Sequence, residues 1–156
     1  MSVLSGEVGT LRHCVAELRQ LQSTRALVAE NPCAPVATHD PGLAQRQNLT
    51  VVENALSHLH RHYQAPALSL TAVAGALGCN PRYLTARFTL IVGEHMHAYL
   101  VRLRVAHACR LLLDTNVPIK EAAYASGFHG NGGLARAFRR HVGVSPGEYR
   151  RIFAAR

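Results

Sequence analysis

Hydrophobic positions recur at helical spacing along most of this chain, and no segment shows the alternation of polar and apolar residues typical of a strand. Apolar side chains three and four positions apart predict an amphipathic helix over residues 10–30, which Asn31-Pro32 would end. After residue 48 the helical pattern resumes, divided by glycines, prolines and capping residues. It predicts further helices over residues 48–63, 69–78, 80–92, 95–113, 118–126, 131–141 and 145–151. The chain is therefore predicted to be all-α.

The segment that follows the first helix, residues 31–48, contains three prolines and a glycine, which predicts a linker. Thr50 and Glu53 have the spacing of a capping box at the start of the next helix. We therefore expect an N-terminal helix and linker over residues 1–48 and a second domain over residues 49–152. The apolar stripe of the 10–30 helix packs either on its own domain or on a second copy of the chain, as a dimer contact.

The second domain carries nearly the same pattern twice. Small residues, glycines and aromatic residues recur at an offset of 49 for Ala74/Ala123 and Gly78/Gly127, and of 50 for Leu84/Leu134, Phe88/Phe138, Gly93/Gly143 and Tyr99/Tyr149. A single residue inserted after the first glycine accounts for the change of offset. An internal repeat of this kind indicates a duplicated structural unit.

Each copy has the features of a helix-turn-helix. Its first helix needs a small residue where the second helix crosses closely, and Ala74 and Ala123 supply it. The turn needs a residue that accepts a positive φ four positions later, and Gly78 and Gly127 supply that. The leucine and phenylalanine of each second helix would face the core and leave the opposite side to approach a major groove. We therefore predict helix-turn-helix units over about residues 69–92 and 118–142.

A long helix over about residues 95–113 would join the two units. About 18 residues at 1.5 Å each span roughly 27 Å, and the widths of the units bring this distance near the ~34 Å between successive major-groove faces. One chain is therefore expected to contact two neighbouring groove segments on one side of a duplex.

The excess of positive charge lies entirely in the duplicated part of the chain. The net charge is +8, with four basic and four acidic residues in residues 1–50 and thirteen basic and five acidic ones in residues 51–156. All basic residues but Lys120 are Arg, whose guanidinium fork suits phosphates and guanine edges, although a GC-rich genome would also favour Arg codons. This distribution favours double-stranded DNA as the partner.

Other classes of protein find little support in the sequence. The cysteines lack the spacing of a zinc site or a disulfide framework, and no signal peptide or membrane-spanning apolar run is evident, so we expect a cytoplasmic protein. His58 and His62 stand four residues apart, but Leu59 occupies the position of a zincin glutamate and no third ligand is evident. No local signature of a catalytic nucleophile is present. We expect no metal, no cofactor and no enzymatic activity, and a metal-dependent enzyme is the least favoured alternative.

A set of short motifs extends over about residues 50–152. They are Ser69-Leu70 with Val73-Ala74, Tyr83-Leu84 and Phe88; Gly93, Tyr99-Leu100 and Arg104; Leu111-Leu112 through Thr115; and Ile119, Glu121-Ala122-Ala123, Gly127-Phe128, Arg136, Phe138-Arg139-Arg140, Gly143, Ser145-Pro146 and Tyr149-Arg150. In these motifs the chain resembles the DNA-binding domain of the AraC/XylS family of bacterial transcription regulators. The resemblance implies a seven-helix, two-unit domain that binds promoter DNA asymmetrically and usually recruits RNA polymerase, as an activator does.

The resemblance also suggests roles for residues of the two DNA-reading helices. The family usually has an arginine where this chain has Ala86, and three glycines in residues 129–133 replace the usual cap and larger side chains. The predicted base contacts are Arg82, Thr85 and Arg136. Contacts to the DNA backbone are expected from His129, Asn131, Arg139 and Arg140, with Arg87 uncertain.

The sequence therefore predicts a sequence-specific, DNA-binding transcription regulator. Glycines within a helix cost about 1 kcal/mol each, so we expect the second DNA-reading helix to fray at its start and to read bases less well than the first. This leaves open a second interpretation, a degenerate regulator that binds DNA weakly and blocks a relative or RNA polymerase. The β-rich effector domain usual in the family does not fit into 48 residues, so we expect no ligand sensing through such a domain.

Overall fold

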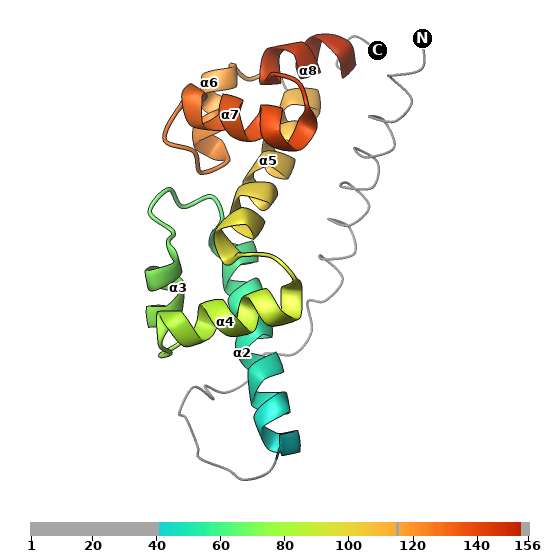
Figure 1. The fold of residues 1–156 in the computed structure, drawn as a ribbon. Helices are drawn as coiled ribbons and strands as arrows, with labels where there is room; N and C mark the ends of the chain where they lie inside the picture. Colours follow the sequence, from blue (N-terminus) through green and yellow to red (C-terminus); the bar gives the residue numbers. More distant parts are fainter. Residues whose placement is uncertain (1–40, 115, 154–156) are drawn as a thin grey trace, which may run out of the picture. The chain divides into compact units, whose positions relative to one another are not determined.

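The computed structural model describes residues 41–114 and 116–153, which form helices and short connections (Figure 1). The described helices are α2 (Pro41–His62), α3 (Leu70–Ala76), α4 (Pro81–Val92), α5 (Met96–Asp114), α6 (Ile119–Ala125), α7 (Asn131–Val142) and α8 (Pro146–Phe153). These residues contain no strand, and the predicted all-α class is confirmed. The helix predicted over residues 10–30 lies outside the described residues, as does the predicted linker up to residue 40.

The start of α2 differs from the prediction. α2 begins at Pro41, so residues 41–48 are helical rather than part of a linker. Proline is favoured in the first turn of a helix, where its missing N–H would have no partner, so Pro41 begins the helix instead of breaking it. Thr50 therefore lies inside α2, and its hydroxyl donates to the carbonyl of Arg46 at 2.9 Å. The predicted capping box of Thr50 and Glu53 is wrong.

The described chain divides into two compact units. The first unit, residues 41–100, contains α2, α3, α4 and the beginning of α5. The second unit, residues 101–114 and 116–153, contains the rest of α5 with α6, α7 and α8. Each copy of the repeated sequence pattern thus contributes its helix-turn-helix to a different unit.

In the first unit α2, α3 and α4 pack against one another over an apolar core. Its buried side chains include Val52, Ala55 and Leu59 of α2, Val73 and Ala74 of α3, Leu84 and Phe88 of α4, and Tyr99 of α5. The rings of Phe88 and Tyr99 meet edge to face, with their centroids 5.6 Å apart and an interplanar angle of 78°. The Tyr99 hydroxyl also lies 2.8 Å from Nε2 of His60, which ties the beginning of α5 to α2.

The second unit builds an equivalent core from α5, α6, α7 and α8. Its buried side chains include Val105, Ala108, Leu112, Ala122, Ala123, Phe128, Leu134, Phe138 and Tyr149. The rings of Phe138 and Tyr149 again meet edge to face, at 5.2 Å and 73°. The repeat in the sequence is therefore also a repeat in the packing of the two cores.

Residues that can be recognised in the sequence set several of the helix ends. The Ser69 hydroxyl accepts a backbone N–H of α3 at 3.2 Å, and the Asn80 side chain accepts one of α4 at 2.8 Å. The second helices of the two helix-turn-helix units, α4 and α7, both end at a glycine with positive φ, 82° at Gly93 and 87° at Gly143. These glycines set where both helices end.

Candidate nucleic-acid interface

The two helix-turn-helix turns have the same backbone geometry. Ala74 and Ala123, the small residues predicted at the helix crossing, are fully buried. The carbonyl of each alanine accepts the backbone N–H of the residue five positions later, at 2.9 Å in the first turn and 3.0 Å in the second. Gly78 and Gly127 precede these donors with φ of 64° and 82°, a conformation that costs other residues about 1 kcal/mol or more. The turn therefore sets the direction in which α4 or α7 leaves the preceding helix.

The outward side of α4 carries one charged residue followed by small and apolar ones. Leu84 and Phe88 are fully buried on the side toward the core. The other side of α4 exposes three residues at a spacing of four, which are Arg82, Ala86 and Leu90. Leu90 has 73% of its surface exposed, the largest fraction among the exposed large hydrophobic side chains of the described residues. This side of α4 is accessible to a large ligand.

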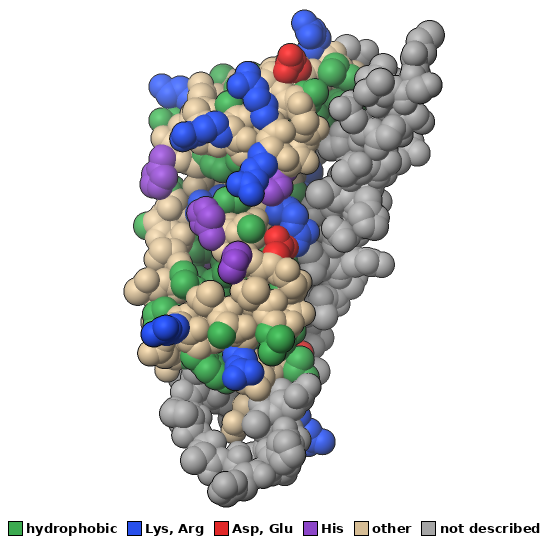
Figure 2. Space-filling model, viewed as in Figure 1, with side chains coloured by type: hydrophobic (Ala, Val, Ile, Leu, Met, Phe, Trp, Pro, Cys, Tyr) green, Lys and Arg blue, Asp and Glu red, His purple; other side chains and the backbone are tan. Residues whose placement is uncertain are grey.

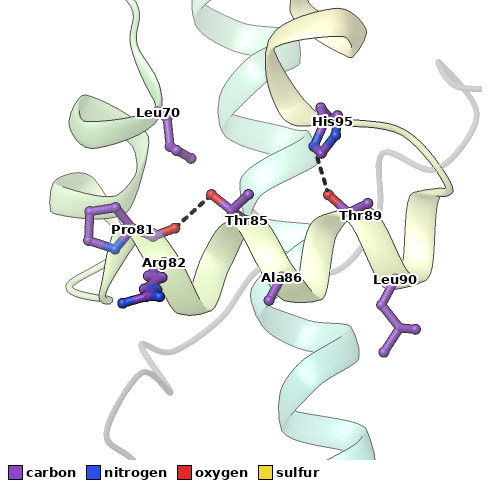
Figure 3. Close-up of a pocket in the computed structure, with 8 residues that line it drawn as sticks. All are labelled: Leu70, Pro81, Arg82, Thr85, Ala86, Thr89, Leu90 and His95. Atoms are coloured by element: carbon purple, nitrogen blue, oxygen red, sulfur yellow. Dashed lines mark hydrogen bonds between the residues drawn. The ribbon is translucent and has the colours of Figure 1, made fainter.

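A shallow cavity of about 630 Å³ lies over the outward side of α4, between Leu70 of α3 and His95 (Figure 3). Thr85 and Thr89 line it, but their hydroxyl groups are engaged within the protein. The Thr85 hydroxyl donates to the carbonyl of Pro81 at 2.8 Å, and the Thr89 hydroxyl lies 3.3 Å from Nδ1 of His95. Both threonines therefore contribute mainly their methyl groups to the lining of the cavity.

Arg87 lies on a different side of α4 from Arg82. Its guanidinium carbon is 5.5 Å from the centroid of the Tyr83 ring, a cation–π contact. The Tyr83 hydroxyl donates to the Asn48 side chain of α2 at 2.6 Å. Nε of Arg87 is buried without a hydrogen-bond partner among the described residues. This arrangement directs Arg87 toward Tyr83 and away from the cavity.

The outward side of α7 is basic. Leu134 and Phe138 are fully buried on its inner side. Its exposed residues, together with an exposed histidine just before the helix, include His129, Asn131, Arg136, Arg139 and Arg140. Lys and Arg side chains are spread over the surface of α6, α7 and α8 (Figure 2). Every residue predicted to contact DNA from α7 is therefore on the surface.

The first turn of α7 is rich in glycine and has no side-chain cap. Gly130 is the N-cap residue, with φ of 152°, and Gly132 and Gly133 follow inside the helix. A Cβ added at Gly132 would meet no atom within 4 Å, and one at Gly133 would meet Phe128 at an ordinary 3.6 Å. Neither of these two glycines is therefore required by packing. The helix begins at Asn131, and the predicted fraying of this turn stays a prediction.

Equivalent positions of α4 and α7 carry different chemistry. The outward pairs, fifty residues apart, are Arg82/Gly132, Ala86/Arg136, Thr89/Arg139 and Leu90/Arg140. α4 is charged at its start and apolar toward its end, whereas α7 lacks side chains at its start and is charged toward its end. The same scaffold thus presents two distinct surfaces.

Of the residues that line the α4 cavity, the sequence predicts contacts for Arg82 and Thr85 but not for Leu70, Pro81, Ala86, Thr89, Leu90 and His95. The four-residue spacing from Arg82 through Ala86, continued by one step, would have found Leu90. The place of His95 depends on the path of the chain after α4 and has no signal in the sequence.

The histidines of α2 lie close together without forming an evident metal site. The rings of His58 and His62 have their centroids 4.5 Å apart, and burial followed by the charges of His62 and Arg61 lowers the pKa of His58. Within residues 41–114 and 116–153, no three His, Cys, Asp or Glu side chains gather in a way that could hold a metal ion. In the same ranges no helix has the length and apolar character needed to cross a membrane.

Comparison with known proteins identifies the family. A family model described as a helix-turn-helix domain matches residues 73–152, which include both turns and the helices α4 and α7. A putative AraC-like transcription regulator from Streptomyces antibioticus is 34% identical over 101 residues, which are 65% of this chain and 33% of that protein. The chain belongs to the AraC/XylS family. It spans about a third of the length of the Streptomyces antibioticus and Streptomyces lividans regulators that it matches.

Solved domains of the AraC/XylS family have the same fold. The C-terminal domain of AraT, a response regulator from Geobacillus stearothermophilus, is similar with a TM-score of 0.64 and 32% identity, over 65% of this chain and 84% of that one. The DNA-binding domain of AdpA, a global transcriptional factor solved in complex with a target DNA, gives a TM-score of 0.63 and 26% identity, over 67% and 93%. The described helices thus form an AraC-type DNA-binding domain.

Proposed function

We propose that this member of the AraC/XylS family binds specific sequences of double-stranded DNA and thereby regulates transcription. The observation that carries the proposal is the duplicated helix-turn-helix, in which α4 and α7 are held by the same buried leucine and phenylalanine. Each helix keeps an accessible outward side, and helices held in this way read the major groove. The function needs no catalysis, metal or cofactor, and we place it in the cytoplasm, with the genome.

Arg82 of α4 and Arg136 of α7 are the arginines that we propose to read bases. Both are exposed on the outward sides of their helices, and a guanidinium fork can donate two hydrogen bonds to one guanine. Thr85 has its hydroxyl engaged with Pro81, so we propose that it contacts a base through its methyl group.

The contacts to phosphate that we propose come mainly from the second unit. The residues concerned are His129, Asn131, Arg139 and Arg140, all exposed at or near α7. Arginines at such positions neutralise phosphates and release counterions, which makes binding depend steeply on salt. We propose that Arg87 supports α4 through its contact with Tyr83 instead of contacting DNA.

Two partners other than DNA belong to the proposal. As an activator, the protein would recruit RNA polymerase to a promoter, and transcription in vitro from a template that carries the binding site tests this. Residues 10–30, outside the described part of the chain, would form a dimer contact. Sedimentation of the chain with and without these residues tests it.

The experiment that tests the proposed function is selection of bound duplexes from a random DNA pool. We expect a defined consensus, and a consensus with two separated blocks would support contact with two groove segments by one chain. Binding to the recovered duplex is expected to survive about 150 mM salt, where phosphate contacts alone become weak. Failure to recover any consensus would contradict the proposal.

The glycine-rich first turn of α7 favours a second candidate function. With Gly132 and Gly133 in place of larger side chains, this turn has little with which to read bases. A chain whose second unit reads no bases could act as an antagonist that pairs with a relative or with RNA polymerase. Weak binding to all duplexes, abolished at about 150 mM salt, would favour this alternative.

A further inference from the structure

We propose that the outward side of α4 recognises the 5-methyl groups of thymines, so that the first unit selects its DNA largely by apolar contact. The conclusion rests on the proposed function and states what one half of the interface reads. It follows from the composition of the α4 cavity, from the hydrogen bonds of its threonines and from the contrast with α7.

The cavity over α4 is lined mainly by apolar groups. Leu70, Ala86 and Leu90 contribute only hydrocarbon, and Leu90 is 73% exposed. The nitrogen-bearing side chains of the lining, Arg82 and His95, lie apart from each other, with Ala86 between them and Leu90 toward the end of α4 (Figure 3). A base edge that meets the middle of this side of α4 finds few groups with which to form hydrogen bonds.

The two threonines of the cavity strengthen this character. The Thr85 hydroxyl donates back to its own helix at 2.8 Å, and the Thr89 hydroxyl lies 3.3 Å from a ring nitrogen of His95. Hydroxyls engaged in this way are less able to exchange their partner for a base, because the exchange would break an existing hydrogen bond. The methyl groups of Thr85 and Thr89 then continue the apolar row formed by Ala86 and Leu90.

The equivalent side of α7 serves as an internal comparison. Where α4 has Ala86, Thr89 and Leu90, α7 has arginines at all three positions. The scaffold therefore accepts arginine at each of these positions, and the apolar row of α4 is not imposed by the fold. The row formed by Ala86, Leu90 and the threonine methyl groups is therefore open to contact with apolar groups of a ligand.

Thymine is the base whose major-groove edge carries a methyl group, and alanine and threonine methyl groups are its usual apolar contacts. Removal of one methyl group from such a contact weakens binding about fourfold, from the transfer free energy of a buried methylene. Arg82 precedes the apolar row by one helical turn, so a guanine next to the thymines fits the same helix. DNA is favoured over a protein partner because Arg82 lies in the same row on the DNA-reading helix of the domain.

The test uses the full chain and the duplex recovered by selection from the random pool. Thymines of that duplex are replaced one at a time by deoxyuridine, which lacks only the 5-methyl group. We expect a loss of affinity of about fourfold at one or more thymines and no change at the others.

Variants then connect these thymines to α4. In Leu90→Gln or Ala86→Ser, both at exposed positions, we expect the deoxyuridine penalty at the sensitive thymines to fall toward zero. Leu49→Gln is the matched control, because Leu49 is an exposed leucine of α2 outside the cavity, and in it the penalty should persist.

Specific binding with no deoxyuridine penalty would overturn the thymine assignment and leave the proposed function intact. A penalty that persists unchanged in the Leu90 and Ala86 variants would overturn it as well. DNA binding that is wholly insensitive to both variants would assign the apolar row to a protein partner instead. Failure to select any duplex would remove the proposed function and, with it, this inference.

Discussion

The hydroxyl of Tyr99 lies 2.8 Å from Nε2 of His60, while the ring of Tyr99 packs edge to face on Phe88 of α4. One buried side chain thus joins α2, α4 and the start of α5. The corresponding Tyr149 packs in the same way on Phe138 of α7. Each of α4 and α7 therefore packs on a buried tyrosine that follows it in the chain.

Tyr99→Phe should lower the free energy of unfolding by about 1 kcal/mol, because His60 loses a partly buried hydrogen-bond partner and the ring packing is kept. Urea denaturation of the full chain measures the effect. Tyr83→Phe is the matched control, since the Tyr83 hydroxyl also makes a hydrogen bond but is exposed. It should cost less than about 0.5 kcal/mol. An equal loss of unfolding free energy in the two variants would show that the His60–Tyr99 hydrogen bond contributes no more to stability than an exposed one.

Gly132→Ala should stabilise the second unit by up to about 1 kcal/mol, because alanine has the higher helix propensity and the added Cβ meets no atom within 4 Å. Gly78→Ala is the control, since its Cβ would also find open space but its φ is 64°. We expect this change to destabilise the first unit by about 1–2 kcal/mol. Hydrogen exchange of the first turn of α7 would show the gain locally. A destabilised Gly132→Ala would mean that the first turn is not a regular helix in solution.

The stability of the protein should fall as the pH drops below about 6.5, in part because of His107. Burial, and next the charge of Arg110, lower the pKa of His107, whose Nδ1 lies 3.2 Å from the hydroxyl of the fully buried Ser126. A lowered pKa means that folding favours the neutral ring. Its contribution to stability is complete above the unfolded pKa and disappears as the pH falls through the folded pKa.

His58 also makes the protein less stable at low pH, because burial lowers its pKa as well. Thermal melts at about pH 7.5 and about pH 5 measure the combined effect. His107→Gln should reduce the fall in Tm between these conditions, and a double variant with His58→Gln should reduce it further. A fall that is equally large in the double variant would assign the pH dependence to other groups.

Arginines of the two helices should differ in what they contribute to binding. Arg139→Gln or Arg140→Gln should weaken binding to all duplexes and reduce the slope of log K against log salt by about 0.9 for each phosphate that the variant no longer neutralises. Arg82→Ala should instead relax the consensus at one position, at a cost of about 1–3 kcal/mol for the cognate duplex. Titrations at several salt concentrations and repeated selection distinguish the two effects. An unchanged consensus in Arg82→Ala would remove its assignment as a base contact.

Much of the fold could be predicted because its signals are local. Ser69 and Asn80 mark the starts of α3 and α4, and the equivalent glycines Gly93 and Gly143 mark the ends of α4 and α7. The start of α2 was misplaced because proline has two opposite meanings, as a breaker inside a helix and as a favoured first residue. Only the fold shows which meaning applies at Pro41.

The candidate site was less predictable, because its chemistry depends on partners distant in the sequence or on side-chain direction. The exposure of Arg82 and Arg136 follows from helical spacing relative to the buried leucines and phenylalanines. The contact of Arg87 with Tyr83, by contrast, is fixed in part by the hydrogen bond of Tyr83 to α2. The hydrogen bond from the Thr85 hydroxyl to Pro81 depends on the rotamer of Thr85, which the sequence does not reveal.

The central claim is that this domain distinguishes one DNA sequence from others, and competition binding tests it most directly. Labelled duplex from the selection is bound by the full chain at about 150 mM salt and displaced by the same duplex or by one of scrambled sequence. We predict that the scrambled duplex is at least about a thousandfold weaker as a competitor, as is typical of specific binding by transcription regulators. Equal displacement by the two duplexes would contradict the account.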